Sequence, residues 1–212
     1  MRSVLSTSLS VSLATGIYGI SFGALGIAAG LDLLSVMLLS LLMFSGASQF
    51  AFIGVMAAGG APLVAVLSSW LLGNRNGFYA IRLKPILRPV GFQRLTAAQL
   101  TIDESNAVSA AQNDQDKQRL GFWATGVGVF VFWNLATFLG AVAGDFIGDP
   151  QVWGLDAAAA AAFLGLLWPK LKGRLILALL AGAVALLLSP WLPPGAAILS
   201  AALVALWPMG EK

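Results

Sequence analysis

The chain of 212 residues contains no cysteine and no histidine. Without cysteine it can form neither disulfides nor thiol-based active sites. Without histidine it lacks a common zinc and haem ligand and the one side chain that ordinarily titrates near neutral pH. We therefore expect no metal site and no cofactor, and any proton-coupled step has to use carboxylates.

Charged residues are also scarce. They make up 10% of the chain, against 58% hydrophobic residues, and the net charge is only +3. A soluble domain of this composition would have too little polar surface to face water. The basic residues lie in short joints beside hydrophobic blocks, which is typical of membrane topology signals and not of a surface that binds nucleic acid. The composition therefore indicates a protein embedded in a lipid bilayer.

The hydrophobic residues form long blocks, and from Ser3 to Ala80 the only formal charges are Asp32 and Arg75. A helix of about 20 residues crosses the roughly 30 Å hydrocarbon core of a bilayer. The blocks therefore predict an all-α polytopic membrane protein with about seven transmembrane or re-entrant helices in one domain, residues 1–212. The first block is too long and glycine-rich for a signal-peptide core, so we expect it in the mature fold. The segments run approximately from Val4 to Ala29, Leu34 to Ala58, Pro62 to Ala80, Leu120 to Gly144, Leu155 to Trp168, Arg174 to Leu188 and Gly195 to Trp207.

The joints between the blocks predict the orientation in the membrane. The basic joints, from Arg75 to Arg94 and from Lys170 to Arg174, should face the cytoplasm, and the acidic joint from Asp145 to Asp156 the outside. Three full crossings before the first basic joint would place the amino terminus outside. If Arg2 is instead cytoplasmic, one early segment must be re-entrant. We favour a broken or re-entrant second segment, because Gly46 and its polar neighbours interrupt it.

One extended polar stretch covers residues 93–119 and has a helix-compatible composition. Thr101 and Glu104 fit the S/T-x-x-E pattern of an N-terminal capping box. The stretch is either a solvated cytoplasmic helix or a re-entrant, pore-lining hairpin, and the sequence leaves both open.

Glycine recurs every three or four residues in the first block, which aligns the glycines on one helix face. A second stripe ends the fourth block. Such stripes allow two helices to pack closely in lipid, although a subunit interface in a higher oligomer or a moving hinge would use them as well. The two stripes comprise Gly16, Gly19, Gly23, Gly26 and Gly30, and Gly140, Gly144 and Gly148.

Two polar clusters interrupt the early blocks. FSGASQF, residues 44–50, contains Ser45, Ser48 and Gln49, which either join helices by hydrogen bonds or line a wet cavity. If Gly46 breaks the helix, freed backbone groups join them, as in transporters with discontinuous helices. GNRNGFY, residues 73–79, ends the third block, and its Arg75 is either a snorkelling end-of-span cation or a bidentate ligand for a carboxylate. That carboxylate would come from the substrate or from the pair that lies nearest in sequence, Asp103 and Glu104.

Four motifs, GISFGALGIAAG (residues 19–30), FSGASQF, NRNGFY (residues 74–79) and TIDES (residues 101–105), occur in the order and approximate spacing of one family. The chain resembles the AzlC family, the larger subunit of two-component branched-chain amino acid exporters, over nearly its whole length. The resemblance implies a multi-pass secondary exporter of hydrophobic amino acids in the cytoplasmic (inner) membrane, working with a small AzlD-type subunit.

The resemblance also implies roles for individual residues. Residues of the second predicted segment and of the turn after the third segment would bind the substrate. An acidic pair would couple transport to an ion. Where the family usually has histidine after the arginine, this chain has Asn76, which excludes a histidine proton relay. The implied substrate residues are Ser45, Gly46, Ala47, Ser48, Gln49, Arg75, Asn76 and Tyr79, and the coupling candidates are Asp103 and Glu104.

Two other function classes are weighed against a transporter. An intramembrane enzyme could use Asp103 and Glu104 as acid and base, but adjacent carboxylates point to different helix faces and no hydrolase or Walker motif is present. A structural or ABC-type permease subunit would need its ATPase on a separate chain. We expect a transporter and no enzyme.

Overall fold

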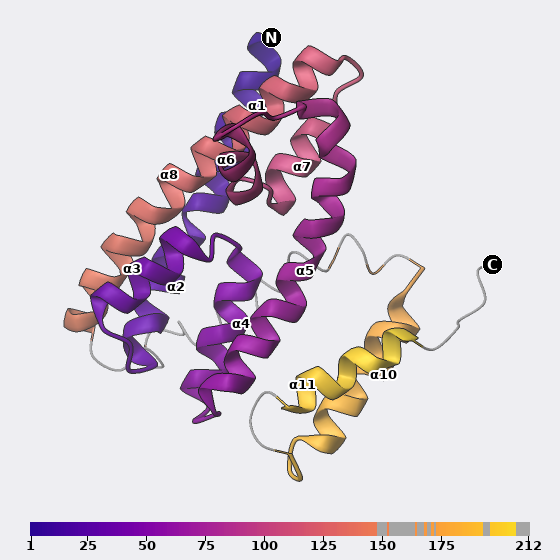
Figure 1. Cartoon of the computed structure of the whole chain (residues 1–212). Helices are drawn as coiled ribbons and strands as arrows, with labels where there is room; N and C mark the ends of the chain where they lie inside the picture. Colours follow the sequence, from indigo (N-terminus) through magenta and orange to yellow (C-terminus); the bar gives the residue numbers. More distant parts are fainter. Residues whose placement is uncertain are drawn as a thin grey trace.

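The computed structural model describes residues 1–147, 173–192 and 196–206, with residues 152, 164, 168 and 171. In these parts the chain forms helices and no strand, which confirms the all-α fold (Figure 1). Most of the predicted segment from Leu155 to Trp168 lies outside the described residues, as do Lys170, Lys172 and most of the acidic joint. The helices are α1 (Arg2–Gly16), α2 (Tyr18–Ala28), α3 (Leu33–Leu42), α4 (Gly46–Ala57), α5 (Pro62–Leu87), α6 (Gln93–Gln99), α7 (Asp103–Ala110), α8 (Gln115–Ile147), α10 (Leu175–Leu188), α11 (Ala196–Ala201) and the 3₁₀ helix η3 (Ala202–Leu206).

Two helical stretches in the described part are long and apolar enough to cross a bilayer, Arg2–Ala28 and Gln115–Gly144. The first joins α1 and α2 with only a turn at Ile17 between them. The apolar helices α3, α4 and α10 are shorter. Helices long enough to span the membrane are thus found at two of the predicted segments. The total of about seven transmembrane or re-entrant helices stays a prediction.

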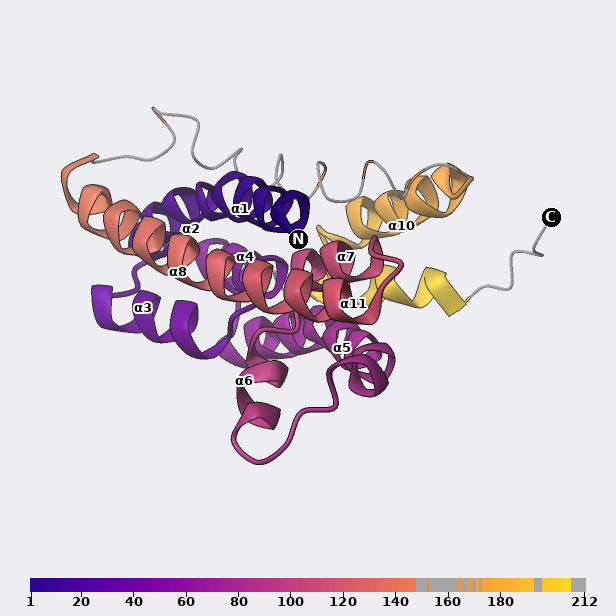
Figure 2. The same ribbon diagram turned by 90° about the horizontal axis from the view of Figure 1, so that it is seen from above.

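The glycine stripes of α2 and α8 bring these two helices into backbone contact. A Cβ atom added at Gly19 would lie 2.6 Å from the carbonyl oxygen of Trp133, and one at Gly140 would collide with the backbone of Ile20. Farther along, Thr125 Oγ1 of α8 donates a hydrogen bond to Ser8 Oγ of α1 at 3.0 Å. Figures 1 and 2 show α1 and α2 side by side with α8 over most of its length. The predicted close helix packing is confirmed within the chain.

The second predicted segment is broken, as the sequence indicates. Helix α3 ends at Leu42, α4 begins at Gly46, and three non-helical residues separate them. Asp32 caps α3 by accepting a hydrogen bond from the Ser35 N–H at 2.8 Å, and this bonding to Ser35 lowers the pKa of the Asp32 carboxyl. Figure 1 shows α3 and α4 as a hairpin that enters the bundle and returns to the end from which it came. Arg2 and the carboxyl end of α5 therefore lie at the same end of the bundle.

Helix α5 corrects one prediction. The sequence predicts a segment that ends at Ala80 with a polar turn at residues 73–79, whereas the helix continues through that motif to Leu87. Asparagine, arginine and glycine lower the hydropathy there, but they do not break a helix as proline does. Arg75 consequently lies near the middle of a helix of 26 residues and not in a joint.

The polar stretch 93–119 forms α6, α7 and the first turn of α8. Its predicted capping box is wrong, because α7 begins at Asp103 and the cap lies one residue later: Ser105 Oγ accepts from the Ile102 N–H at 3.1 Å, while Thr101 Oγ1 donates to the Ala97 carbonyl at 2.6 Å. Leu100 and Ile102 are buried in the hydrophobic core. The α6–α7 linker and one face of α7 are therefore packed into the bundle, whereas residues 93–95 and 113–117 are exposed.

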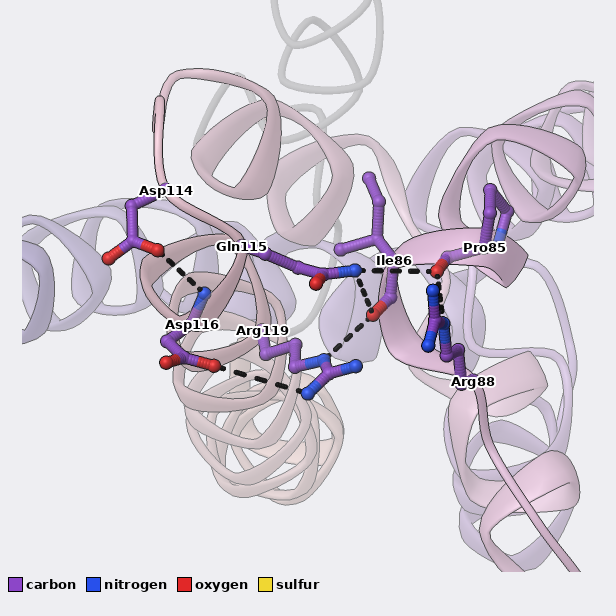
Figure 3. A network of polar contacts seen from close by, with 7 residues as sticks. All are labelled: Pro85, Ile86, Arg88, Asp114, Gln115, Asp116 and Arg119. Atoms are coloured by element: carbon purple, nitrogen blue, oxygen red, sulfur yellow. Dashed lines mark hydrogen bonds and ion pairs between the residues drawn. The ribbon is translucent and has the colours of Figure 1, made fainter.

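The start of α8 holds the end of α5. Arg119 Nε donates to the Ile86 carbonyl at 2.7 Å, and Gln115 Nε2 lies 3.5 Å from the carbonyl oxygens of Pro85 and Ile86 (Figure 3). These carbonyls belong to the last turn of α5, where a helix leaves acceptors unused. These contacts fix the carboxyl end of α5 against the start of α8, and they thereby help to position the middle of α5.

Candidate functional site

The break between α3 and α4 opens onto a cavity of about 260 Å³ inside the bundle. Five parts of the chain contribute to its wall: the junction of α1 and α2, the break itself with α4, the middle of α5, the start of α7, and α8. The lining residues are Thr15, Tyr18, Phe44, Ser45, Gly46, Ala47, Phe50, Arg75, Ile102, Asp103, Glu104, Val129 and Trp133.

The amino terminus of α4 forms one side of this cavity. Ser45 is the N-cap, in an extended conformation, and no side chain in the described part of the protein caps the helix through a hydrogen bond. The first N–H groups of a helix have no intrahelical acceptor and carry partial positive charge. Gly46 and Ala47, the first two residues of α4, line the cavity. This side of the cavity therefore favours an anionic group.

The middle of α5 brings a cation to the same cavity. The Arg75 guanidinium forms an ion pair with Asp103 at 2.7 Å between Nη2 and Oδ2, and the two side chains are 27% and 20% exposed. The Tyr79 hydroxyl donates to the other oxygen of Asp103 at 2.6 Å. Among the described residues the buried Nε of Arg75 has no hydrogen-bond partner. Arg75 thus holds Asp103 and keeps one donor unused.

The opposite wall is aromatic. Trp133 of α8 packs edge-to-face on Phe50, with ring centroids 6.2 Å apart, and stacks on Phe22 at 6.3 Å. The tip of the indole would lie 3.1 Å from a Cβ atom at Gly46, so the first turn of α4 sits directly against this ring. The cavity therefore combines an apolar wall with charges of both signs.

The residues that build this cavity lie within one region that a family model matches. The family model described as AzlC protein matches residues 10–147. The chain belongs to the AzlC family. That range includes every residue that lines the cavity.

Two relatives agree with a membrane location for AzlC proteins. The chain is 36% identical over 169 residues to an "Uncharacterized membrane protein" of Archaeoglobus fulgidus, covering 78% of this chain and 74% of that protein. It is 29% identical over 165 residues to "Inner membrane protein YgaZ" of Escherichia coli K12, covering 74% of this chain and 64% of that protein. The chain thus spans less than two thirds of the second relative. No solved structure matches it.

Six of the site residues predicted for this AzlC protein meet at the cavity, namely Ser45, Gly46, Ala47, Arg75, Asp103 and Glu104. The other four surround it without lining it. Ser48 donates to Ser45 Oγ at 3.2 Å, and Tyr79 stands behind Asp103. Asn76 faces a neighbouring cavity. Gln49 is fully buried and donates to the Leu39 carbonyl at 3.1 Å, so it ties α4 to the last turn of α3.

Sequence reasoning missed the far wall of the cavity, which is formed by Thr15, Tyr18, Val129 and Trp133. The first three are ordinary residues of membrane helices and carry no signal of their own. Trp133 is a large aromatic residue in a glycine-rich helix. Its side chain faces the cavity because the close contact of α8 with Gly19 of α2 fixes the rotation of α8 about its axis. Only the packing of α2 against α8 could have identified it.

Proposed function

We propose that this AzlC-family protein is a secondary exporter of branched-chain or other hydrophobic amino acids, inserted as a multi-pass protein in the cytoplasmic membrane. It would act with a small AzlD-type membrane subunit. The family and the names of the relatives support a membrane protein, consistent with a transporter and not an enzyme. Substrate class, direction and partner are our proposal.

One observation carries the proposal: charges of both signs and an open helix terminus meet in a cavity the size of a small solute. A free amino acid is a zwitterion. Its carboxylate would bind at the amino terminus of α4 and the unused donor of Arg75, and its ammonium would bind at Glu104. The cavity of about 260 Å³ is slightly smaller than the roughly 300–1,000 Å³ typical of pockets for drug-sized ligands, which fits a solute as small as an amino acid.

The apolar wall supports a hydrophobic side chain on that substrate. Phe44, Phe50, Ile102, Val129 and Trp133 line the cavity, and all five are at most 7% exposed. Burial of apolar surface contributes roughly 25 cal/mol per Å² and has no directional requirement. Such a wall would accept valine, leucine, isoleucine or methionine without discriminating strongly among them.

Two carboxylates line the cavity, Asp103 and Glu104. Both oxygens of Asp103 are held, by Arg75 and Tyr79, so we assign it a positioning role. Glu104 lies beside it in the first turn of α7, and we propose that the coupling proton is carried there.

Counterflow of labelled valine in ATP-free proteoliposomes tests the proposal, with and without the AzlD-type subunit. We expect wild-type vesicles preloaded with unlabelled leucine to accumulate labelled valine transiently, and Arg75→Ala to abolish this. An enzyme would give no counterflow but would change the substrate chemically. A permease that depends on a separate ATPase would be inactive without ATP. Absence of counterflow from vesicles containing both subunits would refute the proposed function.

A further inference from the structure

A second, larger cavity lies against the first. It has a volume of about 950 Å³ and is formed by α3, the break before α4, α4 itself, α5 as far as Asn76, and α6. Its wall combines apolar side chains, among them the exposed Leu42, Trp70 and Phe92, with hydroxyl and amide groups. The polar residues that line it are Ser45, Ser48, Ser69, Asn74, Asn76, Thr96, Gln99 and Thr101.

The two cavities share part of their walls. Phe44 and Ser45 line both of them. On α5, Arg75 lines the first cavity and its two chain neighbours, Asn74 and Asn76, line the second. The linker between α6 and α7 repeats this arrangement.

In that linker Ile102 lines the first cavity, whereas Thr101 lines the second. Both residues are at most 5% exposed. The partition is therefore built from two non-helical segments, residues 43–45 and 100–102, and the middle of one helix. Broken helices meeting at one level of a bundle are the arrangement by which transporters place a site between two access routes.

The polar part of the second cavity includes an unsatisfied group. Among the described residues the Oδ1 atom of Asn76 is buried without a hydrogen-bond partner. A buried polar atom of this kind is costly unless water or a ligand reaches it. Ordered water in the second cavity would supply a partner to Asn76.

We infer that the second cavity is the other half of the substrate pathway, and that the Phe44 side chain is the gate between it and the binding site. This inference rests on the proposed function. Phe44 is 7% exposed and lies between two helix ends, outside any regular hydrogen-bonded turn. Its ring packs edge-to-face on Phe130 of α8, with centroids 5.0 Å apart. A side chain held by packing alone can rotate without breaking a hydrogen bond, whereas the backbone of Ser45 accepts from Gln49 and is fixed in α4.

The first test uses the absence of cysteine, which makes single-cysteine variants specific. Thr96→Cys places a thiol in the second cavity, and Gln93→Cys places one on the same helix, α6, outside both cavities. Each variant is assayed for valine counterflow before and after reaction with a bulky maleimide. We expect labelling to lower counterflow at least tenfold in Thr96→Cys and to leave Gln93→Cys and the wild type unchanged. A labelled Thr96→Cys protein that transports at its unlabelled rate would overturn the inference.

The second test does not depend on transport, so it separates a failure of this inference from a failure of the proposed function. Ala47→Cys places a thiol in the first cavity only. Its rate of reaction with a small charged thiol reagent is measured in nanodiscs, with Phe44 intact and with Phe44→Ala or Phe44→Leu. We expect Phe44→Ala to raise the rate about tenfold, while leucine, which still fills the space, leaves it near the wild-type value. The rate at Thr96→Cys should be the same in all three backgrounds. Equal rates at Ala47→Cys with and without the Phe44 ring would show that Phe44 does not separate the cavities.

Discussion

Replacing Gly19 by alanine should destabilise the protein, although alanine is the better helix former. A Cβ atom at this position would lie 2.6 Å from the carbonyl oxygen of Trp133 and 3.1 Å from both Ala136 Cβ and Thr137 N. Ordinary contact begins at 3.4 Å, so α2 and α8 would have to move apart by most of an ångström at their closest point. Because a carbonyl oxygen of a helix cannot rotate away, the displacement spreads along the interface. Overpacking of this kind costs about 1–3 kcal/mol.

Gly54→Ala is the matched control. Gly54 lies within α4, and among the described residues nothing would come within 4 Å of an added Cβ atom. The helix propensity of alanine should stabilise this variant by about 0.5–1 kcal/mol. Thermal unfolding of the two purified variants in one detergent measures the difference. Ala136→Gly, which removes one of the three close contacts, should cost less stability in the Gly19→Ala background than in the wild type. Equal stabilisation by Gly19→Ala and Gly54→Ala would refute the backbone contact between α2 and α8.

Three further predictions concern the site. Arg75→Lys should reduce counterflow nearly as much as Arg75→Ala, because an ammonium keeps the charge but cannot contact Asp103 and a ligand together through a planar fork; wild-type rates for the lysine variant would reduce Arg75 to a topology signal. Glu104→Gln should abolish accumulation driven by a pH gradient and retain downhill exchange, whereas Asp103→Asn should lower both, and proteoliposomes with and without an imposed gradient distinguish the two outcomes. Gln49→Leu should express and insert normally, since one hydrogen bond between membrane helices contributes only about 0.6 kcal/mol on average. Its transport should fall because the tie to the Leu39 carbonyl is lost, and unchanged transport would show that the hairpin needs no such tie.

The sequence predicted best those features that depend on neighbours along the chain. Glycines three and four residues apart define a helix face in any helix, so close helix packing through these two faces could be predicted, although the pairing of α2 with α8 could not. A glycine flanked by serines inside an apolar run likewise indicated the break before α4. Both features follow from local spacing alone.

Features that depend on the rotation and the ends of helices were harder to predict. Hydropathy falls at residues 74–76, but a helix ends only when its hydrogen bonds end, and α5 continues to Leu87. The prediction therefore placed Arg75 at the membrane surface and left its partner open between two carboxylates and a substrate. The sequence left Gln49 open between joining helices and lining a wet cavity, and only the structure shows its amide nitrogen bonded to the Leu39 carbonyl of α3. Spacing gives the face of a helix, but not which neighbour that face meets.

The position of Arg75 has a consequence for biosynthesis. Arginine at the centre of a membrane helix costs about 2.5–3.5 kcal/mol on insertion, and α5 carries it near its middle between two asparagines. Its partner Asp103 lies in α7 and is made later. Until Asp103 has been synthesised, Arg75 therefore lacks the carboxylate with which it pairs in the folded protein. We expect a chain that is arrested between Leu87 and Asp103 to hold α5 in the membrane less stably than the complete chain does.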